Sequence, residues 1–443
     1  MTLQSLLNNV LPKNGDFEIF HLQSNPCEIV PIITPKSKIT GSKENPDSRT
    51  VKTQHFIALS CKKKFVYALE IFVYITVQND TDKKYQKIQP PAERLIFISK
   101  ADTNGYSDVR FSTKDVTRVI LEYILKIDPN YYLLRVKPLK RKYKKEDKKN
   151  FIIGKDKIQN NLKKLSKKAL DNTCHILDQD IYFLNISFAG KFITKICLFT
   201  RPADQYLFPG SSSNRGKHIL NGMQLMKWWL HIIDNLVEEK FDRSNKLKAC
   251  LKIPGEDVLR VGKHFVGCRY RNWKSGDIFS DDLNSLAAFC IPLFPDDPKS
   301  RFLHQLVEEN RILDTNLRTF WFELQERQEF KLSVLVSVIG VEGYTVETSS
   351  YSPIQGEDVI VTSSLKQFHF LKNYISAEEY DTEEGAIESY FNVSKYLSSN
   401  LNMKLLKLVG SEKVLARKQN SKVNLLERGS VVTILTPRKK HKQ

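Results

Sequence analysis

Two runs of β-branched and aromatic residues, at 55–59 and 65–77, constrain the fold of this chain more than any other feature of its sequence. Such runs are typical of strands, and their closeness in the chain predicts that they pair with each other. The second run is interrupted by Glu70 and is shorter than a membrane span, so it predicts a buried strand. A chain of 443 residues can hold two or three domains or one large α/β unit.

Strand and helix patterns alternate along the rest of the chain. Further strands are predicted at 95–98, 131–136, 181–186, 193–199 and 330–341. Helices are predicted from Ser112 onward, at 221–239, 299–313 and 320–328, and in a stretch that follows the acidic segment 378–388 and ends near Leu397.

The net charge of +19 is concentrated in two segments. Residues 135–168 carry 15 lysines and arginines against 3 acidic residues, and residues 411–443 carry 9 against 2. The remainder of the chain is neutral, so the basicity is typical of interaction arms and not of a groove built into the core. The tail ends in Pro437 to Lys442, a pattern that fits nuclear import or nucleic-acid binding.

Several classes of protein are excluded by what the sequence lacks. The N-terminus has neither the basic start nor the apolar segment of a secretory signal. The 7 cysteines are scattered without a C-x-x-C pair, which favours reduced thiols and argues against a disulfide framework and a zinc site. The segment 210–217, GSSSNRGK, resembles a phosphate loop only loosely, because five residues separate its glycines and His218 follows the lysine. We therefore predict no metal and no ATP hydrolysis.

Two adjacent carboxylates, Asp296 and Asp297, stand between prolines at the start of the helix predicted from residue 299. The simplest interpretation is structural, because Asp followed by Pro is a strong helix-start signal. The alternative is a rigid acidic corner at the rim of a pocket, which attracts a cationic amine and accepts its proton.

Other polar residues are expected at element ends. Asp102 follows the predicted strand 95–98 and precedes an Asn-Gly turn, and open sheets bind ligands at such strand ends. The helix that begins after Ser112 is flanked by Arg110 and Lys114, which fits a phosphate site or an ordinary capped helix. In the helix 221–239, Trp229 falls on the apolar stripe, whereas Trp228 is rotated away from it.

Longer motifs occur together in one order. They are AERLIFISKADTNGY (92–106), IDPNYYL (127–133), TKICLFTRPADQYLFP (194–209), KHILNG (217–222), MKWW (226–229), IPLFPDDPKSRFLHQL (291–306), ELQERQEFKLSV (323–334) and EEYDTEEGAIE (378–388). With them the chain strongly resembles the fungal histone H3 lysine acetyltransferases named for regulation of Ty transposition, which are distantly similar to the CBP-type acetyltransferases. The resemblance spans nearly the whole chain and is weakest in the basic segments.

The resemblance implies a fold and a domain organisation. The fold is a central mixed β-sheet flanked by helices, as in CBP-type acetyltransferases, with a long basic loop insertion and a basic C-terminal tail. One acetyltransferase domain would span 1–410, with 135–175 as the insertion and 411–443 as the tail.

The resemblance also implies a site. Catalytic roles fall on Asp297, Asp296, Asp102, Trp229 and Tyr206. Acetyl-CoA contacts fall on Ala101, Asp102, Thr103, Arg110, Phe111, Ser112, Thr113, Lys114, Phe199, Ala203, His218, Ile219, Leu220, Trp228 and Arg301. Lys299 matches a lysine that members of the family acetylate on themselves.

The implied activity is acetyl transfer from acetyl-CoA to lysines of histone H3 within H3–H4, in replication-coupled nucleosome assembly and genome stability. Histone chaperones of the nucleosome-assembly-protein and anti-silencing types would present the histones, in the nucleus, with no membrane involved. Whether the basic segments bind DNA is left open. The competing hypothesis is a non-enzymatic chromatin or nucleic-acid binding protein that acts through its basic arms, and it gives no reason for the Asp and Trp pairs.

Overall fold

The computed structural model describes residues 2–33, 48–78, 92–139, 183–186, 188–244, 246–326, 335–346 and 351–411. Most of the predicted insertion 135–175 and all but the first residue of the predicted tail 411–443 lie outside these ranges, so both stay predictions. Within the described ranges, no helix is long and apolar enough to cross a membrane.

A single mixed sheet forms the centre of the molecule. Its strands are β1 (Phe17–Gln23), β2 (Cys27–Ile29), β3 (Ser48–Cys61), β4 (Lys64–Gln78), β5 (Ala92–Thr103), β6 (Phe192–Thr200), β7 (Lys248–Lys252), β8 (Trp273–Ser275), β9 (Ser337–Gly343), β10 (Ile360–Val361) and β11 (Leu406–Leu408). Their order is β10-β1-β3-β4-β5-β6-β9-β7-β8, with β11 beside β1 and β2 beside β3. The β3–β4 and β4–β5 pairs are antiparallel, and β5–β6 is parallel.

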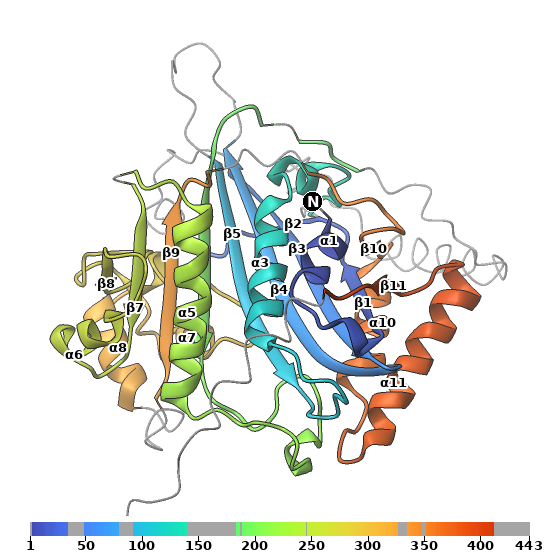
Figure 1. The fold of residues 1–443 in the computed structure, drawn as a ribbon. Helices are drawn as coiled ribbons and strands as arrows, with labels where there is room; N and C mark the ends of the chain where they lie inside the picture. Colours follow the sequence, from blue (N-terminus) through green and yellow to red (C-terminus); the bar gives the residue numbers. More distant parts are fainter. Residues whose placement is uncertain are drawn as a thin grey trace, which may run out of the picture.

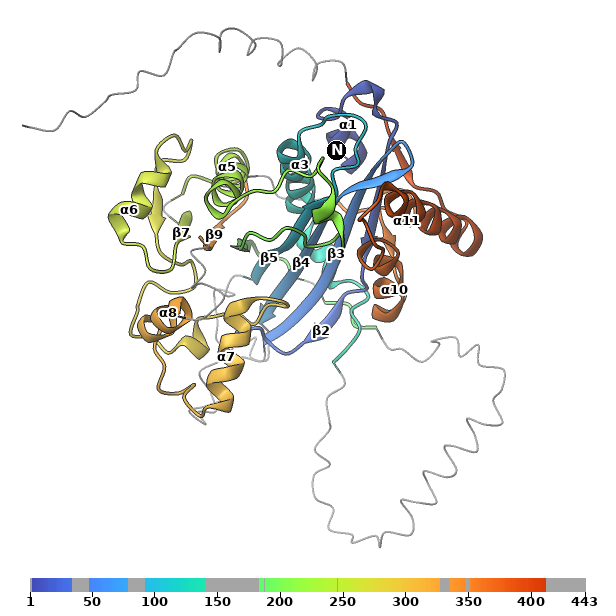
Figure 2. The same cartoon turned by 90° about the horizontal axis from the view of Figure 1, so that it is seen from below.

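Helices cover both faces of the sheet (Figures 1 and 2). One face carries α1 (Leu3–Asn8), α3 (Thr113–Lys126) and α5 (Gly222–Lys240); the other carries α7 (Pro298–Glu308), α8 (Leu317–Glu326), α10 (Leu365–Ser376) and α11 (Glu383–Tyr396). The short helix α6 (Val258–Gly262) lies at the end of the sheet beside β7. Because both faces are covered, β4 is buried at nearly every position, which explains its continuous apolar run.

The structure confirms the strands predicted at 55–59, 65–77, 95–98 and 193–199, which lie inside β3, β4, β5 and β6. It also confirms the helices that begin after Ser112 and at 221–239, each capped by the side chain that precedes it. The expected central mixed sheet flanked by helices is therefore correct.

Three element predictions were wrong. Residues 131–136 do not form a strand, because Asp128 and Pro129 begin a 3-10 helix, Pro129–Leu133, with Asn130 N–H donating to the Asp128 carboxylate. The described part of 181–186 makes only an isolated bridge, Val136 with Leu184. Helix α7 ends at Glu308 and not at 313, since Asn310 adopts a left-handed conformation (φ 56°).

The strand predicted at 330–341 begins at Ser337, and 327–334 lie outside the described residues.

A buried polar chain ties the sheet to the segment that carries β10. Nδ1 of His21 lies 3.0 Å from the Asp358 carbonyl oxygen, and its Nε2 lies 3.0 Å from Nδ1 of His55. Nε2 of His55 is 3.1 Å from the hydroxyl of Tyr132. Burial lowers the pKa of His21 to about 4 and the pKa of His55 well below its usual value, so both rings are neutral at pH 7.

These two histidines are expected to destabilise the fold in mild acid. Below pH 6.5 the unfolded chain binds protons at both rings while the folded chain does not, so stability falls between pH 6.5 and about 4. Each ring should contribute a slope of up to about 1.4 kcal/mol per pH unit. Denaturant unfolding from pH 7.5 to 5 measures the slope, which should flatten in H21Q/H55Q and persist in H304Q, where the replaced histidine is exposed. An equal slope in all three proteins would contradict the assignment.

Candidate active site

A cavity of about 230 Å³ opens at the end of β5 where Asp102 stands. It is bounded by the last residues of β5, the start of α3, the 203–220 connection and the first turns of α5. Eleven of the predicted site residues line it: Ala101, Asp102, Thr103, Thr113, Ala203, Tyr206, His218, Ile219, Leu220, Trp228 and Trp229. Residues from four separate parts of the chain thus meet at one strand end, as expected for a ligand site in an α/β sheet.

Asp102 fixes the wall of this cavity. Its Oδ2 accepts hydrogen bonds from the backbone N–H groups of Tyr206 (2.7 Å) and Leu207 (2.9 Å), and a longer one from Phe208 (3.3 Å). Its Oδ1 accepts from the N–H of Thr103 (2.8 Å). The carboxylate is buried and fully engaged, so the contacts favour a positioning role over the direct attraction of a substrate amine.

Lys217 completes the Asp102 cluster and was missed by the sequence analysis. Its Nζ lies 3.0 Å from Oδ1 of Asp102, with both side chains 4% exposed, and it also donates to the Ser211 hydroxyl. The sequence offered one signal for this contact, because a carboxylate that is buried at a strand end needs a cation close to it. Tyr67 and Leu225 also line the cavity and were missed, because their apolar runs indicate only core.

The start of α3 lies at the cavity, and only Thr113 of its predicted contact residues lines the wall. Ser112 caps the helix by accepting from the N–H of Asp115 (3.2 Å). Phe111 packs edge-on against Phe17 at 5.7 Å, which anchors the turn. Arg110 is exposed and Lys114 is half-buried at this helix N-terminus, where positive charge and free N–H groups favour anions.

Aromatic rings form the apolar side of the cavity. Trp228 and Trp229 meet edge to face with ring centroids 4.7 Å apart; Trp229 is buried, and Trp228 is more open, as the helical spacing predicts. Burial raises the pKa of Tyr206 to about 12, so its hydroxyl stays protonated at neutral pH and donates to the Arg201 carbonyl. The rings can therefore desolvate an amine but supply no base.

The acidic corner at the start of α7 holds two carboxylates in different environments. Asp297 caps α7 by accepting from the N–H of Lys299 (3.0 Å), and its Oδ2 lies 2.6 Å from Nζ of the same lysine. The two side chains are 0% and 2% exposed, and the ammonium sits 4.8 Å from the centroid of the Phe199 ring. The structural interpretation is therefore confirmed, because Asp297 caps α7, and the proposed proton acceptor at a pocket rim stays a prediction.

Asp296 connects the corner to the strand that carries Asp102. Its carboxylate is exposed and lies 2.9 Å from Nζ of Lys100, two residues before Asp102, and this contact lowers the pKa of Asp296. Asp296 holds a left-handed conformation (φ 54°), which few residues other than glycine adopt. The corner therefore adjoins the end of β5 without lining the cavity. Of the remaining predicted residues, Arg110, Phe111, Ser112, Lys114, Phe199 and Arg301 also lie outside its lining.

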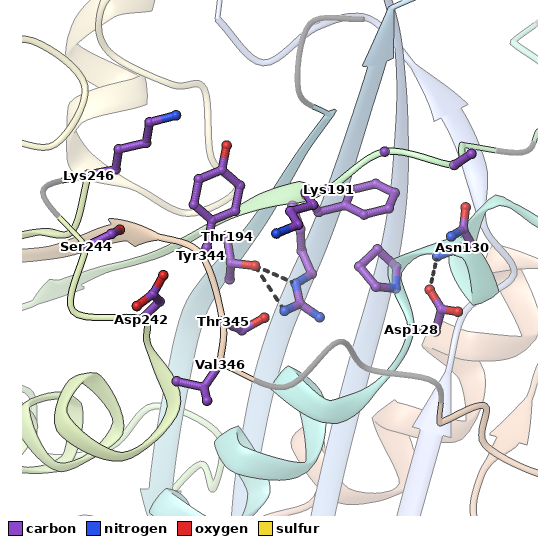
Figure 3. A pocket seen from close by; sticks show the side chains of 15 residues that line it. Asp128, Asn130, Lys191, Thr194, Asp242, Ser244, Lys246, Tyr344, Thr345 and Val346 are labelled. Carbon is purple, nitrogen blue, oxygen red and sulfur yellow. Dashed lines mark hydrogen bonds between the residues drawn. The ribbon is translucent and has the colours of Figure 1, made fainter.

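A larger cavity of about 1120 Å³ lies around the starts of β5 and β6, near the end of β9, and no predicted site residue lines it (Figure 3). Its buried Arg94 donates to Thr194 and to the carbonyl oxygens of Leu125 and Ile127 at the end of α3. Those contacts are structural, so size alone does not make this cavity the site. Among the described residues, no group of three or more His, Cys, Asp and Glu side chains could hold a metal ion.

The geometry defines an α/β protein with a cavity at a strand end and an acidic corner beside that strand. The profile of the histone acetyltransferase KAT11-type domain matches residues 3–396. The chain belongs to this family, and it is therefore an acyltransferase of histone lysines.

Individual relatives agree with this assignment. The chain is 32% identical over 370 residues to the histone acetyltransferase RTT109 of Candida albicans, which covers 83% of this chain and 93% of that protein. It is 25% identical over 339 residues to histone acetyltransferase rtt109 of Aspergillus flavus, covering 69% of this chain and 47% of the relative. The crystal structure of Rtt109 from Aspergillus fumigatus superposes with a TM-score of 0.63 at 19% identity, over 93% of this chain and 99% of that one, and this supports the fold.

Proposed function

We propose that this chain transfers the acetyl group of acetyl-CoA to the ε-amine of lysines in histone H3. The observation that carries the proposal is the meeting of eleven predicted residues in one strand-end cavity beside the Asp296–Asp297 corner. Membership of the histone acetyltransferase family supports the reaction class, and the position of the cavity supports the choice of these residues as the site.

The residues present fit acetyl-CoA, whose thioester would supply the acetyl group. A phosphate-bearing molecule needs cations and free N–H groups, and the α3 N-terminus with Arg110 and Lys114 offers both. The cavity wall from Ile219 to Trp228 is largely apolar and suits an uncharged acyl chain.

The substrate amine needs to lose a proton, and at pH 7 this costs about 4.6 kcal/mol from a lysine pKa near 10.4. Asp297 is the buried carboxylate of the corner that adjoins β5, and Lys299 holds it in an ion pair. Acetylation of Lys299 would remove the ammonium charge and release Asp297 to accept the proton of an incoming amine. Self-acetylation of Lys299 would thus switch the corner from a structural ion pair to a base. If Asp297 instead orients the amine, the rate acceleration comes from holding the amine close to the acetyl group.

The proposal is tested by incorporation of labelled acetyl groups into H3–H4. The full-length chain is expected to label H3 from acetyl-CoA, and mass spectrometry should find acetyl-Lys299 on the enzyme. Absence of histone labelling together with steeply salt-dependent DNA binding would support the non-enzymatic alternative.

The biological setting is part of the same proposal. We place the activity in the nucleus, with histones delivered by chaperones of the nucleosome-assembly-protein and anti-silencing types. The family similarity supports a chromatin substrate. Addition of such a chaperone should raise the rate on H3–H4 without raising self-acetylation of Lys299.

A further inference from the structure

We infer that one end of the sheet carries a docking surface for an acidic peptide segment with aliphatic side chains, contributed by a partner protein. The α6–β8 surface consists of Val258, Leu259, Lys263, Val266, Arg271 and Lys274. The segment from α6 to β8 that carries it lies beside β7 (Figure 1), and it includes no residue of the candidate active site.

Three large aliphatic residues of this surface face solvent. Val258 is 68% exposed, Leu259 is 83% exposed and Val266 is 86% exposed. The backbone beneath them is anchored, because Val261 is fully buried and Phe265 stacks on Trp273 at 6.0 Å. This anchored segment therefore holds the apolar side chains out of the core, which is typical of an interaction site.

The same segment carries cations without counter-ions. Within the described residues, Lys263, Arg271 and Lys274 form no ion pair. A cavity of about 680 Å³ is lined by Arg271 and Lys274, and by three further cations that are paired with carboxylates (Arg243 with Glu238, Lys248 with Asp281 and Arg269 with Glu239). A side chain placed at Gly262 or Gly267 would meet nothing within 4 Å, so the face is open. Unbalanced positive charge next to exposed aliphatic groups is complementary to an acidic, aliphatic segment.

The observations favour another protein over the chain itself and over nucleic acid. The acidic segment 378–388 lies at the opposite end of the sheet, beside α11 (Figures 1 and 2), and the long segments 140–182 and 412–443 are basic. Nucleic-acid binding would account for the cations but not for three exposed aliphatic residues, since phosphates and bases are bound by cations, polar groups and aromatic rings.

The experiment measures binding of a short fluorescent peptide, made of Glu and Asp interrupted by Leu and Ile, to the full chain by anisotropy. We expect a Kd of about 10 μM and about tenfold weaker binding when the Leu and Ile residues of the peptide are replaced by Ser. Both L259S/V266S and R271E/K274E should weaken binding about tenfold, and only the second should flatten its salt dependence. The matched control is K366E/K395E, which reverses two exposed lysines on α10 and α11 and should bind as the parent does.

Each contrary result overturns the inference. If the two peptides bound equally, or if K366E/K395E weakened binding equally, binding would depend on net charge alone and not on this surface. A DNA duplex that displaces the peptide and is bound equally by L259S/V266S would indicate a nucleic-acid surface. Self-association that is lost in L259S/V266S would indicate a second copy of the chain. Thermal melts and acetylation of free H3 should be unchanged in L259S/V266S, which separates this surface from the proposed acetyl transfer.

Discussion

Replacing Asp297 by Asn is expected to lower the free energy of unfolding by about 3–5 kcal/mol, because it removes the carboxylate that lies 2.6 Å from the buried ammonium of Lys299. Asn still caps a helix well, so the start of α7 is preserved and the loss comes from the ion pair alone. Denaturant unfolding measures the change.

A double-mutant cycle isolates that ion pair. In D297N/K299M neither member of the pair is charged, so much of the stability should return, while K299M alone leaves the Asp297 carboxylate buried and unpaired. The matched control is D257N, which replaces an exposed capping aspartate on α6 and should change stability by less than about 0.5 kcal/mol. If D297N and D297N/K299M were equally destabilised, the buried pair would not be the cause.

The same variants separate the two chemical roles of Asp297. D297N/K299M should be folded and lacks the carboxylate, so its kcat on histone should fall by about 10²–10⁴-fold relative to K299M at neutral pH if Asp297 is a base. The loss should shrink at high pH, where the substrate amine is already neutral. A loss that is independent of pH would assign Asp297 to orientation of the amine.

Local signals in the sequence were enough for much of this site. Asp297 before Pro298 predicts the helix start, and the spacing of Trp229 predicts its burial, because caps and helical periodicity are properties of neighbouring residues. The Asn-Gly turn likewise places Asp102 at a strand end.

The partners of these residues could not be predicted from local patterns. Three of the N–H donors to Asp102 come from Tyr206 to Phe208, and its cation comes from Lys217, about a hundred residues along the chain. Such contacts exist only after β5 and β6 have paired, and in the sequence Lys217 belongs to a false phosphate-loop pattern. For the same reason Tyr132 was misassigned to a strand, since its burial arises from the tertiary contact with His55 and not from a sheet.

Replacing Asp102 by Ala is expected to cost about 10²-fold or more in kcat/KM for histone acetylation, although no contact of Asp102 requires it to touch a substrate. The loss of the carboxylate removes the acceptor for the N–H groups of Thr103, Tyr206 and Leu207 and leaves the Lys217 ammonium buried and unpaired. The 206–208 wall should then move away from the end of β5. Steady-state kinetics and thermal melting measure the two consequences.

A second substitution, at Lys217, distinguishes a displaced cavity wall from the loss of a group that acts on the substrate. D102A/K217M removes the unpaired Lys217 ammonium and should recover much of the melting temperature. Its kcat/KM should stay low, because the backbone N–H groups that donate to Asp102 still lack their acceptor. The control D281A removes an exposed aspartate with a single ion pair, to Lys248, and should leave both readouts unchanged. If D102A kept its melting temperature and lost only kcat, Asp102 would act on the substrate directly. The hydrogen bonds of its two oxygens favour the displaced wall. A carboxylate that already accepts from several backbone N–H groups and contacts an ammonium has little capacity left for an incoming amine.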